Sequence, residues 1–363
     1  MHHPSNFPDA SPAPLSTRPQ ADAAPAAELE IGEYLPEGTS AWVLSDGKIG
    51  DEVQCLGILE AMGLEPERRL VAPRKIFAFA MPWGPIDPRE ARSRKKSPIA
   101  GPLPDIIIAA GRRCVPYLRY LKTASGGAAF TVFVKDPYCR RHGADLIWVP
   151  EHDRLRGDNV ITTLTPANRL SAAILARARR SPDPRIAALP HPRVALMLGG
   201  PSNHHSFGAK EEDDLKSIAV ALALSGAGMM VTPSRRTPKR LVSMLHAALC
   251  NDTSMGERAF VWLGEDENPY VAMLANADSI IVTGDSVNMI GESLASGAPV
   301  HVYEPCGGHR KITAYIDDLV AQGLVRRWRG RLEDWSYTPL NATPHIAAEV
   351  KRRFLAFREK KMR

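Results

Sequence analysis

Residues 283–305 read TGDSVNMIGESLASGAPVHVYEP and place a small polar turn between two apolar runs. A strand is expected to end before this turn, a helix to run from the turn to Ala295, and a further strand to begin after Gly297. Small side chains at the turn leave room for a ligand against the unpaired N–H groups of the helix start. The turn also suits a purely structural interpretation, with Ser286 as a helix cap and Asp285 as a turn former.

Two further stretches repeat this order of strand, glycine-containing turn and helix. One is SAWVLSDGKIGDEVQCLGILEAMGL at 40–64, and the other begins with RVALMLGGPSNHHSFG at 193–208. Continuous apolar runs, typical of strands covered on both faces, occur in PDIIIAAGRR (104–113), FTVFVKDP (130–137) and ADLIWVPEHD (144–153). This alternation predicts a parallel, doubly wound α/β fold whose ligands bind beyond the carboxyl ends of the strands.

The chain is expected to form two domains, because 363 residues with 44% apolar content exceed what one core usually serves. Residues 1–38 are rich in Pro and Ala and are interpreted as a disordered tail. The first domain is expected over 39–184 and the second over 185–340, with the boundary in a proline-bearing stretch. In residues 341–363, apolar residues recur at near-helical spacing, which predicts a final amphipathic helix.

Charge and cysteine content narrow the class of protein. A net charge of +6 and a pI near 9.1 fit an acidic partner such as a nucleotide or an anionic lipid, while no motif supports nucleic-acid binding. The five cysteines lack CxxC or CxH spacing, so neither a disulfide framework nor a metal site is expected. Without a long apolar run or an export signal, a cytoplasmic protein is expected.

A pair of arginines follows the predicted strand GMMV in the motif TPSRRTP at 232–238. Planar guanidinium groups suit phosphate, so Arg235 and Arg236 are candidate diphosphate ligands. The alternative is a pair of solvated loop charges.

Five motifs occur in a fixed order: SDGKIGDEVQCLG at 45–57, LGGPS at 198–202, TPSRRTP at 232–238, NPYVAMLANAD at 268–278 and VTGDSVNMIGESLASGAPV at 282–300. With them the chain, from about Ala41 to Arg331, resembles the elongated-mitochondria (mitochondrial fission) protein family, known from plants and bacteria. The resemblance implies a GT-B-like fold, in which two Rossmann-like domains face each other across a cleft and the last helix crosses back to the first domain.

The resemblance also implies that the second domain holds a nucleotide-sugar as donor substrate, with no further cofactor. Glu292 would then bind the ribose, although its spacing alone favours an exposed helical glutamate. The turn would hold the sugar-diphosphate through Thr283, Asp285, Ser286, Asn288 and Met289, and the phosphates would contact Gly199, Gly200, Ser234 and Arg235.

An inverting transfer needs a base that takes the acceptor's proton. Asp46 and Asp51 in the first polar turn are the candidates, with the adjacent His204 and His205 as a second choice. The lipid-linked cell-wall N-acetylglucosaminyltransferase is the implied structural analogue, and its Gly-Gly-x-x-Gly-His loop is replaced here by Asp-Gly-Lys-Ile-Gly-Asp at 46–51. The choice between the aspartates therefore stays open.

Aromatic residues precede a basic run in RKIFAFAMPWGPIDPREARSRKK at 74–96. Residues 77–96 could rest on an anionic membrane, such as the inner membrane face, with each basic residue contributing ~1 kcal/mol. The alternative is a packed segment followed by a solvated loop. The expected function is a nucleotide-sugar-binding glycosyltransferase, for which a lipid-linked acceptor would be suitable. The alternative, implied by plant members of the family, is a non-catalytic adaptor that recruits a protein partner to a membrane.

Overall fold

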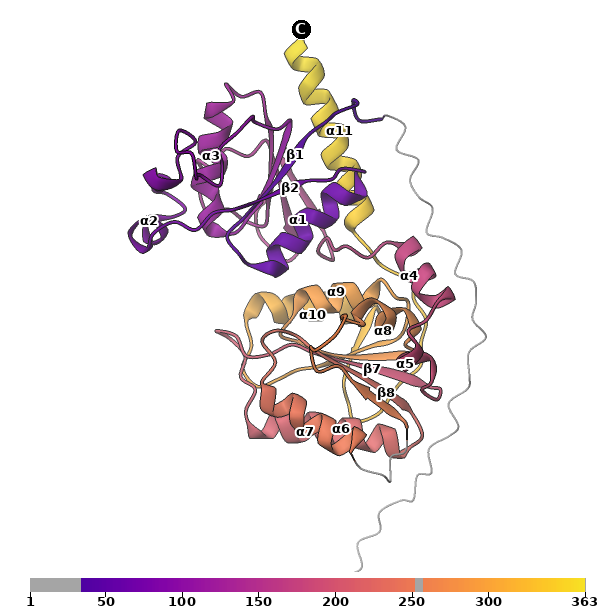
Figure 1. Cartoon of the computed structure of the whole chain (residues 1–363). Helices are drawn as coiled ribbons and strands as arrows, with labels where there is room; N and C mark the ends of the chain where they lie inside the picture. Colours follow the sequence, from indigo (N-terminus) through magenta and orange to yellow (C-terminus); the bar gives the residue numbers. More distant parts are fainter. Residues whose placement is uncertain (1–33, 252–256, 363) are drawn as a thin grey trace, which may run out of the picture.

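A computed structural model describes residues 34–251 and 257–362, which form two α/β domains, each built on a six-stranded parallel sheet (Figure 1). The predicted fold class is confirmed by this arrangement. The tail predicted over residues 1–38 lies almost entirely outside the described residues. No helix of the described residues is both long enough and apolar enough to cross a membrane.

The first sheet has the strand order β2-β1-β3-β4-β5-β6. Its strands are β1 (Ala41–Ser45), β2 (Glu67–Leu70), β3 (Ile106–Ala110), β4 (Phe130–Val134), β5 (Leu146–Pro150) and β6 (Val160–Thr163). The helical segments are α1 (Ile49–Ala61), α2 (Lys75–Ala80), α3 (Val115–Ala124) and the short 3-10 turns η1 (Pro88–Glu90) and η2 (Arg112–Cys114). The strands β1, β3, β4 and β5 are buried along their whole length, because helices cover both faces of the sheet.

The second sheet has the strand order β12-β11-β10-β7-β8-β9. Its strands are β7 (Arg193–Leu198), β8 (Gly228–Pro233), β9 (Ala259–Val261), β10 (Ser279–Thr283), β11 (Val300–Tyr303) and β12 (Val325–Arg327). Its helices are α4 (Ala172–Arg180), α5 (Pro184–Ala187), α6 (Ala209–Leu224), α7 (Lys239–Cys250), α8 (Tyr270–Asn276), α9 (Val287–Leu294) and α10 (Arg310–Ala321). This order is that of a Rossmann sheet.

Each sheet has one switch point, where consecutive crossovers leave in opposite directions. In the first sheet it lies between β1 and β3, and in the second between β7 and β10. Loops diverge at a switch point and leave a crevice at the carboxyl ends of the two strands, which is where open α/β sheets bind ligands. The candidate residues after β1, β7 and β10 therefore lie at the two positions that the topology favours.

The last helix, α11 (Thr343–Met362), crosses back from the second domain and packs on the first, where Figure 1 draws it in yellow. Ile346, Val350 and Phe354 belong to the same buried cluster as β1, β3 and α1. The ring of Phe354 lies 6.0 Å from that of Phe130 in β4. The predicted crossing of the terminal helix is thus confirmed, and it provides a second covalent connection between the domains.

The chain passes from the first domain into the second before α4 begins. Leu170 and Leu175 lie in the core of the second domain, and Arg179 donates to the carbonyl oxygens of Ala275 at 2.9 Å and Ser296 at 2.7 Å. Sequence composition instead placed the boundary near residue 185. The difference arises because the polar, proline-bearing stretch follows a helix that is already docked on α8.

Candidate functional site

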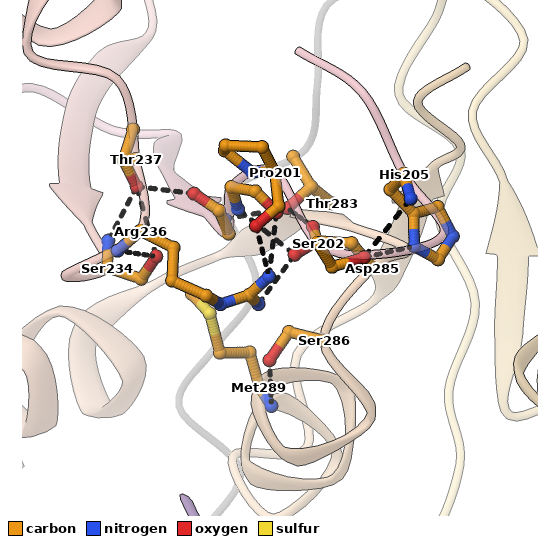
Figure 2. A network of polar contacts seen from close by, with 12 residues as sticks. Pro201, Ser202, His205, Ser234, Arg236, Thr237, Thr283, Asp285, Ser286 and Met289 are labelled. Carbon is orange, nitrogen blue, oxygen red and sulfur yellow. Dashed lines mark hydrogen bonds and ion pairs between the residues drawn. The ribbon is translucent and has the colours of Figure 1, made fainter. Parts of the chain in front are cut away.

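At the switch point of the second sheet, the backbone after β7 packs directly on a carboxylate after β10 (Figure 2). The N–H of Gly200 donates to Oδ2 of Asp285 at 3.0 Å, and the N–H of Gly199 donates to Oγ1 of Thr283 at 2.7 Å. Thr283 donates in turn to Oδ1 of Asp285 at 2.7 Å. A β-carbon on Gly199 would lie 2.1 Å from that oxygen, so no side chain fits at this position.

Arg236 completes this network from the loop after β8, and its guanidinium points at Asp285 in Figure 2. Its Nη2 donates to Oδ2 of Asp285 at 2.7 Å and its Nη1 to the carbonyl oxygen of Gly200 at 2.7 Å. The side chain of Asp285 is 0% exposed and that of Arg236 is 43% exposed. A buried carboxylate needs a charged partner of this kind. Through the ion pair and its hydrogen bonds, the loops that follow β7, β8 and β10 are held together.

The other residues of the TPSRRTP motif have different environments. Ser234 is tied to its own loop, because its N–H donates to Oγ1 of Thr237 at 2.8 Å and its Oγ accepts from the N–H of Arg236 at 3.2 Å. Arg235 is exposed and forms no hydrogen bond or ion pair with any residue that the structure describes. Of the two adjacent arginines, Arg235 is therefore the one whose guanidinium is available to an anion.

Helix α9 begins at this switch point. The Oγ of Ser286 caps it by accepting from the N–H of Met289 at 3.4 Å, as the structural interpretation of the turn expects. Asn288, in the first turn, points away from the second domain and contacts the first. The start of α9 therefore lies between the two domains.

Glu292 lies two turns after Asp285 and is half-buried. The hydroxyl of Tyr270 donates to its Oε2 at 2.5 Å. Burial raises the pKa of Glu292 to about 7, against the opposing effect of the Tyr270 hydrogen bond. A carboxyl group with this pKa titrates near neutral pH, and its charged form accepts hydroxyl hydrogens on both oxygens, whereas the protonated form donates through one of them.

At the switch point of the first sheet, Asp46 follows β1 and Gly111 follows β3. A β-carbon on Gly111 would lie 2.8 Å from Cγ of Asp46, so the glycine lets the two loops approach each other. The Oδ1 of Asp46 is buried and accepts no hydrogen bond from the described residues. Asp51 differs, because it forms an ion pair with Lys135, a residue after β4 that has a positive φ of 77°. Asp46 therefore keeps a buried acceptor atom, whereas Asp51 is held in an ion pair.

Two sets of contacts hold the domains together beside these loops. Asn288 hydrogen-bonds the first turns of α1 through Gly50 and Gln54. On the other side, Nζ of Lys311 in α10 lies 2.5 Å from Oδ1 of Asp153 and donates to the hydroxyl of Tyr138 at 3.0 Å. The carboxyl edges of the two sheets consequently face each other.

The adjacent histidines occupy different positions. His205 is buried, lies 3.2 Å from Oγ of Ser202 through Nδ1, and has its pKa lowered by burial. The exposed His204 stacks with its ring centroid 4.4 Å from that of His309, which precedes α10. His309 carries no sequence signal that links it to these loops, because its partner His204 is about a hundred residues away. Lys135 follows a predicted strand and Tyr270 lies in the motif at 268–278, but their partners could not be read from the sequence. No group of three metal-ligating side chains occurs among the described residues.

Solved structures with similar chains include UDP-GlcNAc 2-epimerase from Methanocaldococcus jannaschii and MurG from Acinetobacter baumannii. The epimerase is 10% identical with a TM-score of 0.48, and the alignment covers 87% of this chain and 99% of the epimerase. MurG is 12% identical with a TM-score of 0.44, and the alignment covers 87% of this chain and 92% of MurG.

Curated sequences give a more specific relationship. The mitochondrial fission protein ELM1 of Arabidopsis thaliana is 27% identical over 282 residues, which are 70% of this chain and 65% of the plant protein, so the match spans less than two thirds of that relative. The uncharacterized protein RP120 of Rickettsia prowazekii (strain Madrid E) is 25% identical over 85% of this chain and 97% of its own length. The family model for mitochondrial fission ELM1 matches residues 49–354. The chain belongs to the mitochondrial fission ELM1 family.

Proposed function

We propose that the second domain binds a nucleotide-sugar and that the sugar is transferred to an acceptor on the first domain. The observation that carries this proposal is the meeting of two switch points. Asn288, which follows β10, hydrogen-bonds Gly50, which follows β1, so ligands in the two crevices would be neighbours. A transfer reaction needs two substrates held next to each other with their reacting atoms oriented.

The donor would lie against the start of α9. The free oxygen of Glu292 would accept hydroxyl hydrogens of the ribose, and Arg235 would pair with the diphosphate. Arg236 and Asp285 neutralise each other, so their part would be to position the glycine loop at 199–200 rather than to carry the phosphate charge.

The acceptor hydroxyl would donate to Oδ1 of Asp46, the buried oxygen without a partner. The hydroxyl oxygen would form a bond to the anomeric carbon as its proton passes to Asp46, and the bond to the nucleoside diphosphate would break. The negative charge on the leaving diphosphate would be stabilised by Arg235 and by the N–H groups at the start of α9. Asp51 would keep Lys135 in place through their ion pair.

The release of nucleoside diphosphate from a nucleotide-sugar, with and without added acceptor alcohols, tests this proposal. Asp46→Asn keeps the size of the side chain and is expected to lower turnover roughly 10²- to 10⁴-fold while donor affinity stays unchanged. Asp158→Asn, at an exposed position of the same domain, is the control and should behave as wild type. Equal turnover in Asp46→Asn would remove Asp46 from the role of base.

Peripheral contact with an anionic membrane through residues 77–96 is part of the proposal. Phe79 and Trp83 are 86% and 67% exposed, whereas Met81 is buried. The stretch 74–96 also contains seven basic and only two acidic residues. Co-sedimentation with vesicles that contain anionic lipid, compared with neutral vesicles, should show binding that Phe79→Ala weakens and salt reduces.

A non-catalytic adaptor is the second candidate function. It is favoured by the mutual neutralisation of Arg236 and Asp285, which an adaptor would keep for loop structure alone. An adaptor would bind no nucleotide-sugar and would still use the exposed surface around Phe79. Donor binding therefore separates the two candidates.

A further inference from the structure

A cavity of about 500 Å³ opens at the carboxyl edge of the first sheet. It lies between the loop after β4 and the segment that follows α2, and its wall includes Trp83, Tyr138, Arg140, His142 and Leu155. Trp83 and Tyr138 are 67% and 63% exposed, although both are large aromatic residues. Exposed aromatic side chains around a cavity are typical of a ligand site rather than of a packed core.

Two residues that line the cavity, Arg140 and His142, are suited to an anion. Arg140 is exposed and forms no hydrogen bond or ion pair with the described residues. His142 accepts the N–H of Ala144 on Nδ1 at 3.0 Å, so its other nitrogen carries the hydrogen and is a donor. The carboxylate of Asp136 accepts the N–H of Tyr138 at 2.7 Å, which ties its Oδ1 to its own turn. Arg140 and His142 thus both present donors to the cavity, beside Oδ2 of Asp136, which accepts no hydrogen bond from the described residues.

The segment that carries Trp83 has further exposed apolar side chains. Phe79 is 86% exposed and Ile76 is 74% exposed. This segment is held in place through its backbone, because Arg112 donates to the carbonyl oxygen of Phe79 at 3.0 Å and Arg119 donates to that of Gly84 at 2.7 Å. Arg112 and Arg119 thus fix the backbone of this segment. The Arg112 guanidinium also lies 5.8 Å from the centroid of the Trp83 ring, and Trp83 and Phe79 remain largely exposed.

We propose that this cavity binds an anionic amphiphile, with its charged head against Arg140 and His142 and its apolar chain along Trp83 towards Phe79. The charge complementarity follows from Arg140 and His142, and the exposed side chains of Trp83 and Phe79 would cover the apolar chain. A free anion would leave the aromatic surface unused, and a neutral apolar ligand would leave Arg140 without a partner.

The cavity is also next to the contact between the domains. The hydroxyl of Tyr138 accepts from Nζ of Lys311 in the second domain at 3.0 Å, so a bound head group would lie beside the residue that joins the domains on this side. Identifying the amphiphile with the sugar acceptor rests on the proposed function. Binding of the amphiphile in the cavity does not depend on it.

Calorimetric titration of the full chain with dodecyl phosphate, below its critical micelle concentration, tests the proposal. Two comparison ligands separate the two features. Inorganic phosphate supplies only the negative charge, and octyl glucoside supplies an apolar chain without a charge. Dodecyl phosphate is expected to bind saturably and more tightly than either. Arg140→Ala and Trp83→Ala should each weaken it about tenfold or more, which corresponds to about 1.4 kcal/mol. Arg141→Ala, exposed and outside the cavity, is the matched control.

Equal affinity for inorganic phosphate, equal affinity for octyl glucoside, or unchanged binding in both cavity variants would each overturn the proposal. Binding that begins only above the micelle concentration would overturn it as well. A nucleotide-sugar is titrated separately with the same variants, where its affinity should stay unchanged because the cavity variants lie on the first domain. If the wild type binds dodecyl phosphate as expected but binds no nucleotide-sugar, the proposed function is refuted and the amphiphile site is not.

Discussion

Asn288 in the second domain forms two hydrogen bonds with α1 of the first, donating to the carbonyl oxygen of Gly50 at 3.0 Å and accepting from Nε2 of Gln54 at 2.8 Å. A β-carbon on Gly50 would lie 2.9 Å from Nδ2 of Asn288, so this close contact favours glycine at position 50. Each side belongs to the helix that follows the switch-point loop of its own sheet. This contact therefore sets the spacing of the two candidate crevices.

The interaction between Asn288 and Gln54 should be measurable as a coupling free energy. In a double-mutant cycle of Asn288→Ala and Gln54→Ala, we expect about 1 kcal/mol of coupling, the usual net contribution of a side-chain hydrogen bond. Urea denaturation of the four proteins measures it. Strictly additive effects of the two substitutions would show that the hydrogen bond does not form in solution.

Gly199→Ala should destabilise the second domain, because the new β-carbon would lie 2.1 Å from Oδ1 of Asp285. Overpacking of this kind typically costs about 1–3 kcal/mol, with a fall in Tm of roughly 2–4 °C for each kcal/mol. Gly157→Ala is the control, since its β-carbon would have only ordinary contacts at 3.5 and 3.6 Å. Differential scanning calorimetry measures both, and an unchanged Tm in Gly199→Ala would contradict the packing described here.

Stability should fall as the pH drops from about 6.5 to about 4 because of His301. This side chain is 0% exposed, accepts the N–H of Glu333 on Nε2 at 2.9 Å, and has its pKa lowered by burial to about 4. The unfolded chain takes up a proton in this window and the folded chain does not, so the free energy of unfolding should decrease by up to roughly 3 kcal/mol.

Urea denaturation at several pH values measures this dependence. His301→Gln should reduce the slope between about pH 4 and 6.5, whatever its effect on stability at neutral pH. His345→Gln, at an exposed position in α11, should keep the wild-type slope. An identical slope in His301→Gln and wild type would contradict a neutral, buried His301.

Donor binding should strengthen as the pH rises through about 7, since burial raises the pKa of Glu292 to about 7 and its charged form is the stronger acceptor of hydroxyl hydrogens. Tyr270→Phe removes the hydrogen bond that stabilises the charged carboxylate, so the midpoint of the pH dependence should move upward. Calorimetric Kd values between about pH 5.5 and 8.5 test both statements. A wild-type Kd without pH dependence would argue against contact between Glu292 and the donor.

The fold was largely predictable from the sequence because the central strands are continuous apolar runs. The strands β1, β3, β4, β5, β7 and β10 all carry this signal. The edge strand β2, with the sequence ERRL, does not, because its residues are mostly exposed and charged. Hydrogen bonding to β1, rather than its own composition, makes it a strand.

The candidate site was predictable only in part. The motifs identified the loops at the two switch points, but side-chain pairing depends on contacts between residues far apart in the sequence. Nothing in the sequence indicated that Arg236 pairs with Asp285, 49 residues away, or that Lys135 pairs with Asp51, 84 residues away. Among the described residues, the guanidinium of Arg235 and the buried Oδ1 of Asp46 have no partner, which distinguishes them from Arg236 and Asp51, a choice that sequence left open.

Calorimetric titration with UDP-, GDP-, ADP- and CMP-sugars, using wild type and Glu292→Gln, tests the central claim most directly. The account predicts saturable, one-to-one binding of at least one nucleotide-sugar by wild type. In Glu292→Gln the affinity should fall at least about tenfold while the Tm is retained. Folded wild-type protein that binds no member of the panel, or a Glu292→Gln variant that binds as tightly as wild type, would contradict it.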